Sequence, residues 1–568
     1  MPGSPHMSSV EPLSAMPLAG LVRGRAAMPW RAPALVALAL AAGALWGWPL
    51  LGFLLGALLP GWLHGSLRPS LQPFADAVAA GMLPALLHSA LTALAATLLA
   101  LPLGTWLAWL RVRSTLAWRG AIEAGVWALL VLPGYMLASG WMLLAAPIGP
   151  LARWPALLGA AQALLGPAGI VLALALKALP FVFLAVQVAL THDGAAAQEA
   201  ARVLGLTHRQ RLQLALAALL PALAAGAAAA FAESISDFSV AATLGAGSGF
   251  QMATYAIEQA VNAMPLNFPA AAASSWMLLA LVVPALLAQA RAQRAGAATL
   301  GPRHRPAAPL QLSLGASAAH AGAAALLALG ALGVPLAAAA QLALQPAATG
   351  GVGFAQVLPA FGYSLRLALL AASATVALAW AAAALLNRRG GAARALELLL
   401  LAAMALPGIV LAAAYVLAYN QPITPLYGGS SLLAMAYVAL ALPLATKVLQ
   451  GPLAQLHQRL GEAARVHGLS RLHTLRAIEL PLLARALFTA WLLAALHIAF
   501  ELPASELLYP AGHPPLAVAM LDAAAGFQLH LQARLQLLGM ALLLAFALSA
   551  RVAFARLVRT LPTTSRLP

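Results

Sequence analysis

Long apolar runs constrain this chain more than any other feature of its sequence. A helix needs about 20 apolar residues to cross the hydrocarbon core of a bilayer. The sequence has twelve runs near that length, of which the eleventh is short and the fifth contains a proline. They span residues 33–59, 86–110, 121–146, 167–190, 213–236, 268–290, 318–343, 363–387, 395–419, 430–449, 484–500 and 535–556. The runs predict an all-α polytopic membrane protein with about twelve transmembrane helices.

Composition supports that fold class and excludes others. Only 8% of the residues are charged and 63% are hydrophobic, whereas a soluble domain carries roughly 25% charged residues. A transmembrane β-barrel would show alternating segments of about ten residues, which these unbroken runs do not resemble. The chain has no cysteine, so disulfides, thiolate nucleophiles and cysteine-ligated metals are excluded.

The basic residues predict the orientation of the chain. With the N-terminus in the cytoplasm and twelve spans, 26 of the 31 Lys and Arg residues fall in cytoplasmic segments, as the positive-inside rule requires. The exceptions are Arg68, Arg153, Lys177, Arg366 and Arg534. We therefore expect both termini in the cytoplasm. The net charge of +17 then needs no nucleic-acid partner to explain it.

The N-terminal tail, residues 1–32, is polar and ends in a basic cluster. It lacks a short apolar core followed by a small-residue cleavage site, so we do not expect a removable signal peptide. Met28 is an alternative start.

Three anchors recur in the two halves of the chain, in the same order. The pair Pro133-Gly134 recurs as Pro407-Gly408, each preceded ten residues earlier by a glutamate, Glu123 or Glu397. Ala178-Leu-Pro180 recurs 263 residues later as Ala441-Leu-Pro443. The segments 199–206 and 462–469 also lie 263 residues apart, and seven of their eight positions are identical.

Each anchor falls at the same place relative to six spans, so the halves have the same orientation. A parallel repeat of this kind has its axis along the membrane normal. The two Pro-Gly anchors are 274 residues apart, whereas the members of each later pair of anchors are 263 residues apart. We attribute this difference in separation to extra residues in the segment 147–166. The predicted organisation is a tail (1–32), a first repeat (33–300), a cytoplasmic linker (301–317) and a second repeat (318–568).

The longest anchor lies in a cytoplasmic loop between the fourth and fifth spans of each half. Each copy is expected to form a short helix, a glycine turn and a second helix, because glycine adopts positive φ at a helix end. Small alanines and a charged end suit a surface helix that docks into a groove of a soluble partner. The residues concerned are Glu199, Ala200, Ala201 and Gly205 in the first copy and Glu462, Ala463, Ala464 and Gly468 in the second.

This pattern resembles the coupling loop of binding-protein-dependent ABC importer permeases. The second copy matches the whole pattern, because Leu480-Pro481 follows and Pro481 lies 13 residues after Gly468. In the first copy the position 13 residues after Gly205 is Ala218, and the proline comes later, at Pro221. Residues 500–512 and 236–245, together with the Leu-Pro-Gly turns at 132–134 and 406–408, are similar to segments of fused two-domain ferric-iron permeases. Thiamine, polyamine and phosphonate importers share much of this pattern.

The resemblance implies a type I permease in a bacterial inner membrane. It implies two copies of an ABC ATPase on the cytoplasmic face, an extracytoplasmic substrate-binding protein on the other, and no cofactor or catalytic residue in this chain. A phosphate-binding loop needs Gly-Lys-Ser/Thr, and the only lysines, Lys177 and Lys447, follow leucine and threonine. ATP hydrolysis is therefore expected in a partner subunit.

Three carboxylates near the fifth spans are candidate residues of the translocation path or of binding-protein contact. Asp237 and Glu501 follow the fifth span of each half, 264 residues apart, and Glu233 lies inside the first of these spans. Carboxylates at membrane depth are costly and often functional, and a hard cation prefers oxygen ligands. The alternatives are helix capping for the first two and a hydrogen bond across the bundle for Glu233. The 13 histidines are dispersed, and no metal site is predicted.

A secondary transporter driven by an ion gradient is the rival from another class, since it also uses duplicated helical repeats. It would need no ATPase and would place ion-coupling residues in broken helices. An ion channel would need a polar filter segment, and the sequence has none.

The first prediction concerns the second coupling loop. Glu462→Lys should abolish uptake of the transported substrate while leaving membrane insertion intact, because it reverses the charge that orients the docking helix. Uptake in cells, with the amount of inserted protein measured in parallel, tests this. Unchanged uptake by the variant would remove the coupling role.

Overall fold

The computed structural model describes residues 31–192, 203–262, 264–299, 310–345, 354–388, 390–456, 468 and 470–560. Within these ranges the protein is almost entirely helical, and its only strands are the two-residue β1 (Asn420–Gln421) and β2 (Thr424–Pro425), which pair antiparallel. The all-α fold class is confirmed.

The first half contains long helices joined by short helical elements. In chain order they are α1 (Arg31–Ala42), the π-helical turn η2 (Gly43–Gly47), α2 (Trp48–Leu55), η3 (Trp62–His64), α3 (Gln72–Ala79), α4 (Met82–Arg113), α5 (Arg119–Val131), α6 (Gly134–Ala145), η4 (Pro150–Arg153), α7 (Pro155–Ala163), α8 (Pro167–His192), α10 (His208–Ile235), η5 (Ala241–Gly245), α11 (Ala246–Ser248), α12 (Ala253–Asn262) and α13 (Phe268–Thr299).

The second half repeats this order with fewer short elements. They are α14 (Leu314–Ala328), the π-helical turn η6 (Leu329–Gly333), α15 (Val334–Leu344), α16 (Phe354–Leu386), α17 (Gly391–Ala405), α18 (Gly408–Tyr419), β1, β2, α19 (Ser430–Gln455), α21 (Arg471–Thr474), η7 (Leu475–Glu479), α22 (Leu480–Ala499), α23 (Pro503–Leu508), α24 (Leu516–Ala525) and α25 (Leu529–Thr560). The extra segment 147–166 of the first half holds η4 and α7, where the second half has only the β1–β2 hairpin.

The described helices include eleven that are long and apolar enough to cross a membrane. The bent pair α17 and α18 makes a twelfth, so the predicted count agrees with the structure. The fifth run forms one helix, α10, through Pro221, and the eleventh span begins earlier than predicted, at Leu475.

The third run of each half is the exception. We predicted one continuous span over 121–146 and another over 395–419, and the structure has two helices in each range. The first divides into α5 and α6, and the second into α17 and α18, which meet at 104°. The cause is a Leu-Pro step in each. Leu132 and Leu406 have ψ of 120° and 122°, the extended conformation that a following proline favours. We call these the first and second break.

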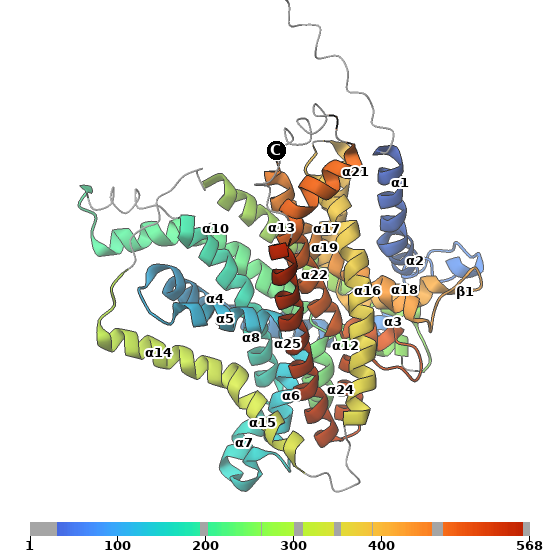
Figure 1. Ribbon diagram of the computed structural model, residues 1–568. Coiled ribbons are helices and arrows are strands. Elements are labelled where there is room, and N and C mark those ends of the chain that lie inside the picture. The colour runs from blue at the N-terminus through green and yellow to red at the C-terminus, as the bar shows by residue number, and fades with distance from the viewer. Residues whose placement is uncertain are drawn as a thin grey trace, which may run out of the picture.

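The two halves exchange their first helices. In Figure 1, α1 and α2 (blue) lie beside α16 and α18 of the second half, respectively, and α15 lies beside α6 of the first half. Tyr415 and Tyr419 of α18 donate hydrogen bonds to the carbonyls of Leu45 (2.9 Å) and Ala44 (2.6 Å) in the π-helical turn η2. The tyrosines thereby fix the first helix of the chain against the second half.

A fourth repeat anchor becomes visible in these exchanged helices. The turns η2 and η6 both end in glycine, Gly47 and Gly333, and proline follows two residues later in each, Pro49 and Pro335. The offset is 286 residues. On α6, a Cβ at Gly140 would lie 2.4 Å from the Cβ of Pro335. Only glycine permits this approach, in the way that small residues allow membrane helices to pack closely.

The second prediction tests this packing. Gly140→Leu should push α15 away from α6 and lower the free energy of unfolding by about 1–3 kcal/mol, the usual cost of overpacking. The measurement is the thermal unfolding midpoint of the purified chain in detergent. Gly322→Leu, in α14 of the same exchanged segment, is the control, because a Cβ there meets no atom within 4 Å. Equal effects of the two substitutions would contradict the account.

Candidate functional site

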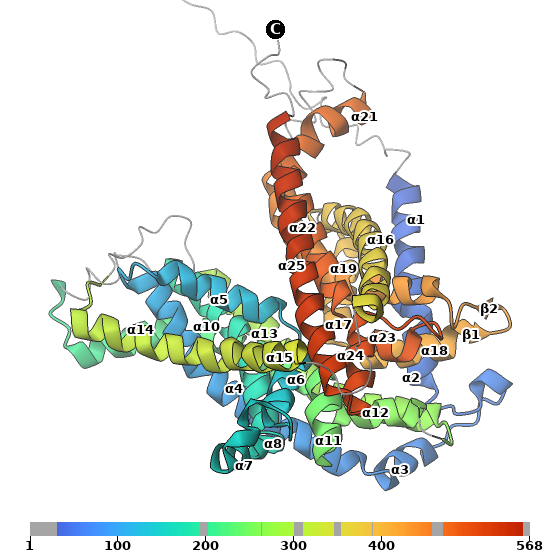
Figure 2. The same cartoon turned by 60° about the horizontal axis from the view of Figure 1, so that its bottom comes forward.

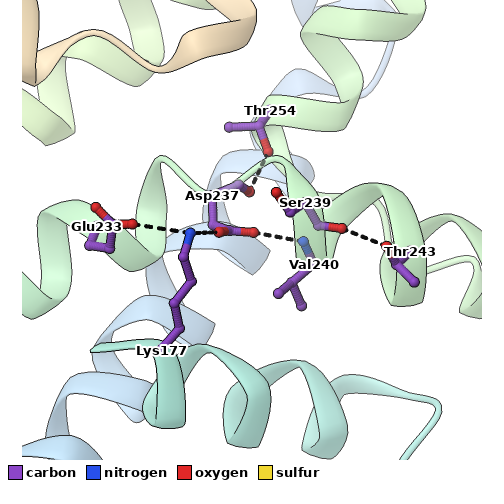
Figure 3. A network of polar contacts seen from close by, with 7 residues as sticks. All are labelled: Lys177, Glu233, Asp237, Ser239, Val240, Thr243 and Thr254. Atoms are coloured by element: carbon purple, nitrogen blue, oxygen red, sulfur yellow. Dashed lines mark hydrogen bonds and ion pairs between the residues drawn. The ribbon is translucent and has the colours of Figure 1, made fainter. Parts of the chain in front are cut away.

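Asp237 lies buried just after α10, facing the first break. Its side chain is 1% exposed. One carboxylate oxygen accepts a hydrogen bond from the backbone N–H of Val240 at 2.6 Å, and the other is paired with the ammonium of Lys177 on α8 (Figure 3). The hydroxyl of Thr254 on α12 donates to the Asp237 carbonyl at 2.9 Å. Asp237 thus caps the start of the next helical segment and holds an ion pair.

Glu233 lies one helical turn before Asp237 and shares the same lysine. Its carboxylate is 3.0 Å from the Lys177 ammonium, and its side chain is 37% exposed. Figure 3 shows the ammonium between the two carboxylates. Glu233 lies within α10, near its C-terminal end. The network joins α8, α10 and the segment that follows α10.

Glu501 has the equivalent capping role in the second half. Its side chain is buried, at 7% exposure, and its oxygens accept hydrogen bonds from the backbone N–H groups of Ala504 (2.9 Å) and Ser505 (3.0 Å). The Ser505 hydroxyl is also hydrogen-bonded to Tyr437 of α19, at 2.7 Å. Backbone donors rather than a lysine therefore satisfy this carboxylate, and the position equivalent to Lys177 is Leu440.

The two breaks contact the two capping carboxylates directly. A Cβ added to Gly134 would lie 3.4 Å from Asp237 Oδ2 and 3.3 Å from Lys177 Cδ. A Cβ added to Gly408 would lie 3.5 Å from Glu501 Oε1 and 3.0 Å from a Pro503 carbon. The Pro-Gly anchors and the carboxylates, recognised separately in the sequence, thus form one repeated local structure.

The halves meet around this structure through polar side chains. His497 of α22 lies within electrostatic range of Glu233 and Lys177, and 264 residues separate it from Glu233, so the two occupy equivalent positions. Ser139 of α6 donates to Gln536 of α25 at 2.9 Å and accepts from Gln532 at 2.8 Å. These contacts connect the first half to the last helix of the chain.

A small cavity lies in the same interface. Its walls include Tyr135, Ser139, Thr243 and Gln532, and its volume is about 10 Å³. The Tyr135 hydroxyl and the Gln532 carbonyl oxygen are buried without a hydrogen-bond partner among the described residues. The cavity has room for about one water molecule, which these groups could bind.

Three carboxylates from both halves gather near α24. They are Glu258 of α12, Glu506 of α23 and Asp522 of α24, helices that lie close together in Figure 2. Burial, followed by the charges of Asp522 and Glu258, raises the pKa of Glu506 from 4.5 to about 7. One Glu506 oxygen is buried and has no partner within the described part of the chain. Burial also raises the pKa of Glu258 and of Asp522.

The first coupling loop is described from Val203 onward, and the second at Gly468 and from Ser470 onward. Glu199, Ala200, Ala201, Glu462, Ala463 and Ala464 lie outside the described residues. Gly205 and Gly468 have φ of +65° and +72°, the left-handed conformation expected for the turn. A hydroxyl two residues later, Thr207 or Ser470, accepts a hydrogen bond from a backbone N–H of the next helix in each copy.

The helices after these turns differ. In the first copy Thr207 and Gln210 form a capping box, and α10 runs on without interruption. In the second copy the π-helical turn η7 precedes Pro481 of α22. The departure of the first copy from the sequence pattern therefore coincides with a continuous helix.

Sequence reasoning missed Lys177 as a site residue, although the signal was present. A lone lysine inside an apolar span is itself a functional indication, and it appeared only as an exception to the charge rule. The equivalence of Glu233 and His497 was also readable from the 264-residue offset. The closeness of Glu258, Glu506 and Asp522 left no signal, because it depends on how the short outer helices fold.

A known protein family matches part of the second half of the chain. Residues 375–561, from within α16 to the end of α25, match the family described as binding-protein-dependent transport system inner membrane component. Residues 375–561 therefore carry an inner-membrane domain of the binding-protein-dependent transport type. The matched region begins after the exchanged helix α14–α15, and the first half repeats its anchors.

A relative supports the same family. Over 206 residues the chain is 28% identical to a probable ABC transporter permease protein, y4fN, of Sinorhizobium fredii (strain NBRC 101917 / NGR234). The match covers 35% of this chain and 35% of the relative. It therefore spans about a third of the relative's length.

The third prediction concerns Glu506. Because its pKa is about 7 in the folded chain and 4.5 without burial, the folded state binds more protons between these pH values, and the free energy of unfolding falls as pH rises through that window. Glu506→Gln should therefore raise the free energy of unfolding at pH 8 by on the order of 2 kcal/mol. The measurement is the unfolding midpoint, which should rise accordingly. The substitution should have little effect at pH 4.5. An equal change at both pH values would contradict the role of ionisation.

Proposed function

We propose that this chain is the membrane-spanning permease of an ATP-driven ABC importer that moves ferric iron into the cytoplasm. The permease domain match and its repetition in the first half support one chain that supplies both membrane subunits. The two glycine turns, with their helix caps at matching positions, support two docking loops for two copies of an ABC ATPase. Substrate arrives from an extracytoplasmic binding protein in this proposal.

The placement in the membrane follows from the charge distribution. The loops at Gly205 and Gly468 fall in segments rich in Arg, which the positive-inside rule assigns to the cytoplasm of a bacterial inner membrane. Both termini then lie in the cytoplasm. ATP binding to the partner subunits would close the two loops together and switch the path between its inward- and outward-facing states.

The observation that favours a cationic cargo is the charge balance between the halves. This region holds three carboxylates and one ammonium, that of Lys177. The carboxylates are those of Glu233, Asp237 and Glu501. An excess of carboxylate favours a cation over an anion such as phosphonate. Oxygen ligands suit a hard cation such as ferric iron. Thiamine and polyamines are also cations, so they are the competitors that matter in an assay.

The absence of a phosphate-binding loop in the full sequence supports a separate ATPase. The rival secondary transporter needs no such partner and would drive uptake in cells depleted of ATP with the ion gradient maintained. The repeated coupling loop favours the ABC importer.

The fourth prediction tests the cargo. Iron-starved cells that carry this gene should take up radioactive iron faster than cells without it, and excess thiamine or polyamine should not compete. Cells that carry Glu462→Lys are the matched control for inserted but uncoupled permease. Competition by thiamine or polyamine would identify that compound as the cargo, and no gene-dependent iron uptake would remove iron while leaving the permease assignment intact.

A further inference from the structure

Lys177 forms ion pairs with Asp237 and Glu233, but only the Asp237 carboxylate is fully enclosed by its partners. The Asp237 carboxylate is 1% exposed and is held by the ammonium and by the N–H of Val240. Its charge is therefore balanced inside the protein. The Glu233 carboxylate contacts the same ammonium but is 37% exposed. One carboxylate of the pair thus remains open to its surroundings.

Glu233 also interacts electrostatically with a residue of the other half. His497 is exposed, and it lies within electrostatic range of both Glu233 and Lys177. Glu233 and His497 occupy equivalent positions of a parallel repeat. Equivalent positions come together only near the axis that relates the halves, which is where the path of the proposed importer runs.

We propose that Lys177 is a fixed counter-charge of the translocation path. It cancels the charge of Asp237 and orients Glu233 toward the space shared with His497. A passing cation then meets one net negative charge at this level instead of two. The inference rests on the proposed function in regarding this space as the path.

A transport path needs such a limit on its charge. Sites along a path must attract the ion enough for entry and release it readily. Two uncompensated carboxylates one helical turn apart would hold a polyvalent cation tightly. In the second half no lysine is needed, because Leu440 stands at the equivalent position and backbone N–H groups satisfy Glu501. Lys177 is therefore a positioning residue that sets the charge of the path without binding the cargo.

The absence of cysteine from the sequence makes a direct test practical. His497→Cys introduces the only thiol, within electrostatic range of Glu233 and Lys177. The labelling rate of this thiol is measured in the full-length chain with two methanethiosulfonate reagents. One carries a cationic trimethylammonium-ethyl group and the other an anionic sulfonatoethyl group. The readout is the ratio of the two rate constants, which responds to local charge and cancels changes in accessibility.

Substitutions that remove a positive or a negative charge should change the labelling ratio in opposite directions. Adding Lys177→Met should raise the cationic-to-anionic ratio by about fivefold or more, as expected for loss of a nearby unit charge. Lys177→Arg, which keeps the charge, should leave the ratio near that of the parent. Glu233→Gln should lower it. Lys177→Met combined with Asp237→Asn should restore the parent ratio, because one net negative charge remains.

The outcomes separate this inference from the proposed function. An unchanged ratio in Lys177→Met, or a thiol at 497 that neither reagent reaches, would overturn the inference. If Lys177→Met fails to fold, Glu233→Gln and the charge-balanced double variant carry the same test. The assay needs neither cargo nor ATPase, so absent iron uptake would contradict the proposed function alone.

Discussion

The structure depends on satisfying backbone groups where a membrane helix is broken. In hydrocarbon every N–H and C=O must find a partner within the protein. The breaks at Pro133 and Pro407 begin new helices, α6 and α18, inside the protein. Each break packs its glycine against a buried carboxylate, Asp237 or Glu501, which itself caps the next segment of its half. The repeated local structure therefore supports irregular backbone at the centre of the molecule.

The two halves use this shared structure differently. The first half balances its carboxylate with Lys177 and adds Glu233, whereas the second has Leu440 and His497 at those positions. The exchange of first helices then binds the halves together, through Tyr415 and Tyr419 on one side and the close contact at Gly140 on the other. The two halves therefore share one local structure but differ in the charges that it holds.

Much of this architecture could be predicted from the sequence, because hydropathy and repetition are local signals. The twelve spans, the parallel repeat, the glycine turns and the permease family were predicted. The Leu-Pro-Gly turns at 132–134 and 406–408 were recognised, but the division of 121–146 and 395–419 into separate helices there was not, because hydropathy carries no information on helix direction and proline is tolerated in membrane helices. The exchange of α2 and α15 depends on packing between distant segments. The site residues Asp237, Glu501 and Glu233 were named from the sequence, but their partners required the structure.

The central claim is that the chain is a parallel repeat whose two docking loops lie on the same face of the membrane. Single cysteines placed by Leu204→Cys or His473→Cys, next to the two glycine turns, test it most directly in sealed vesicles of known orientation. The account predicts that an impermeant thiol reagent labels both from the cytoplasmic side, and Phe527→Cys, beyond α24, from the opposite side. Labelling of Leu204→Cys and His473→Cys from opposite faces would show an inverted repeat and contradict the account.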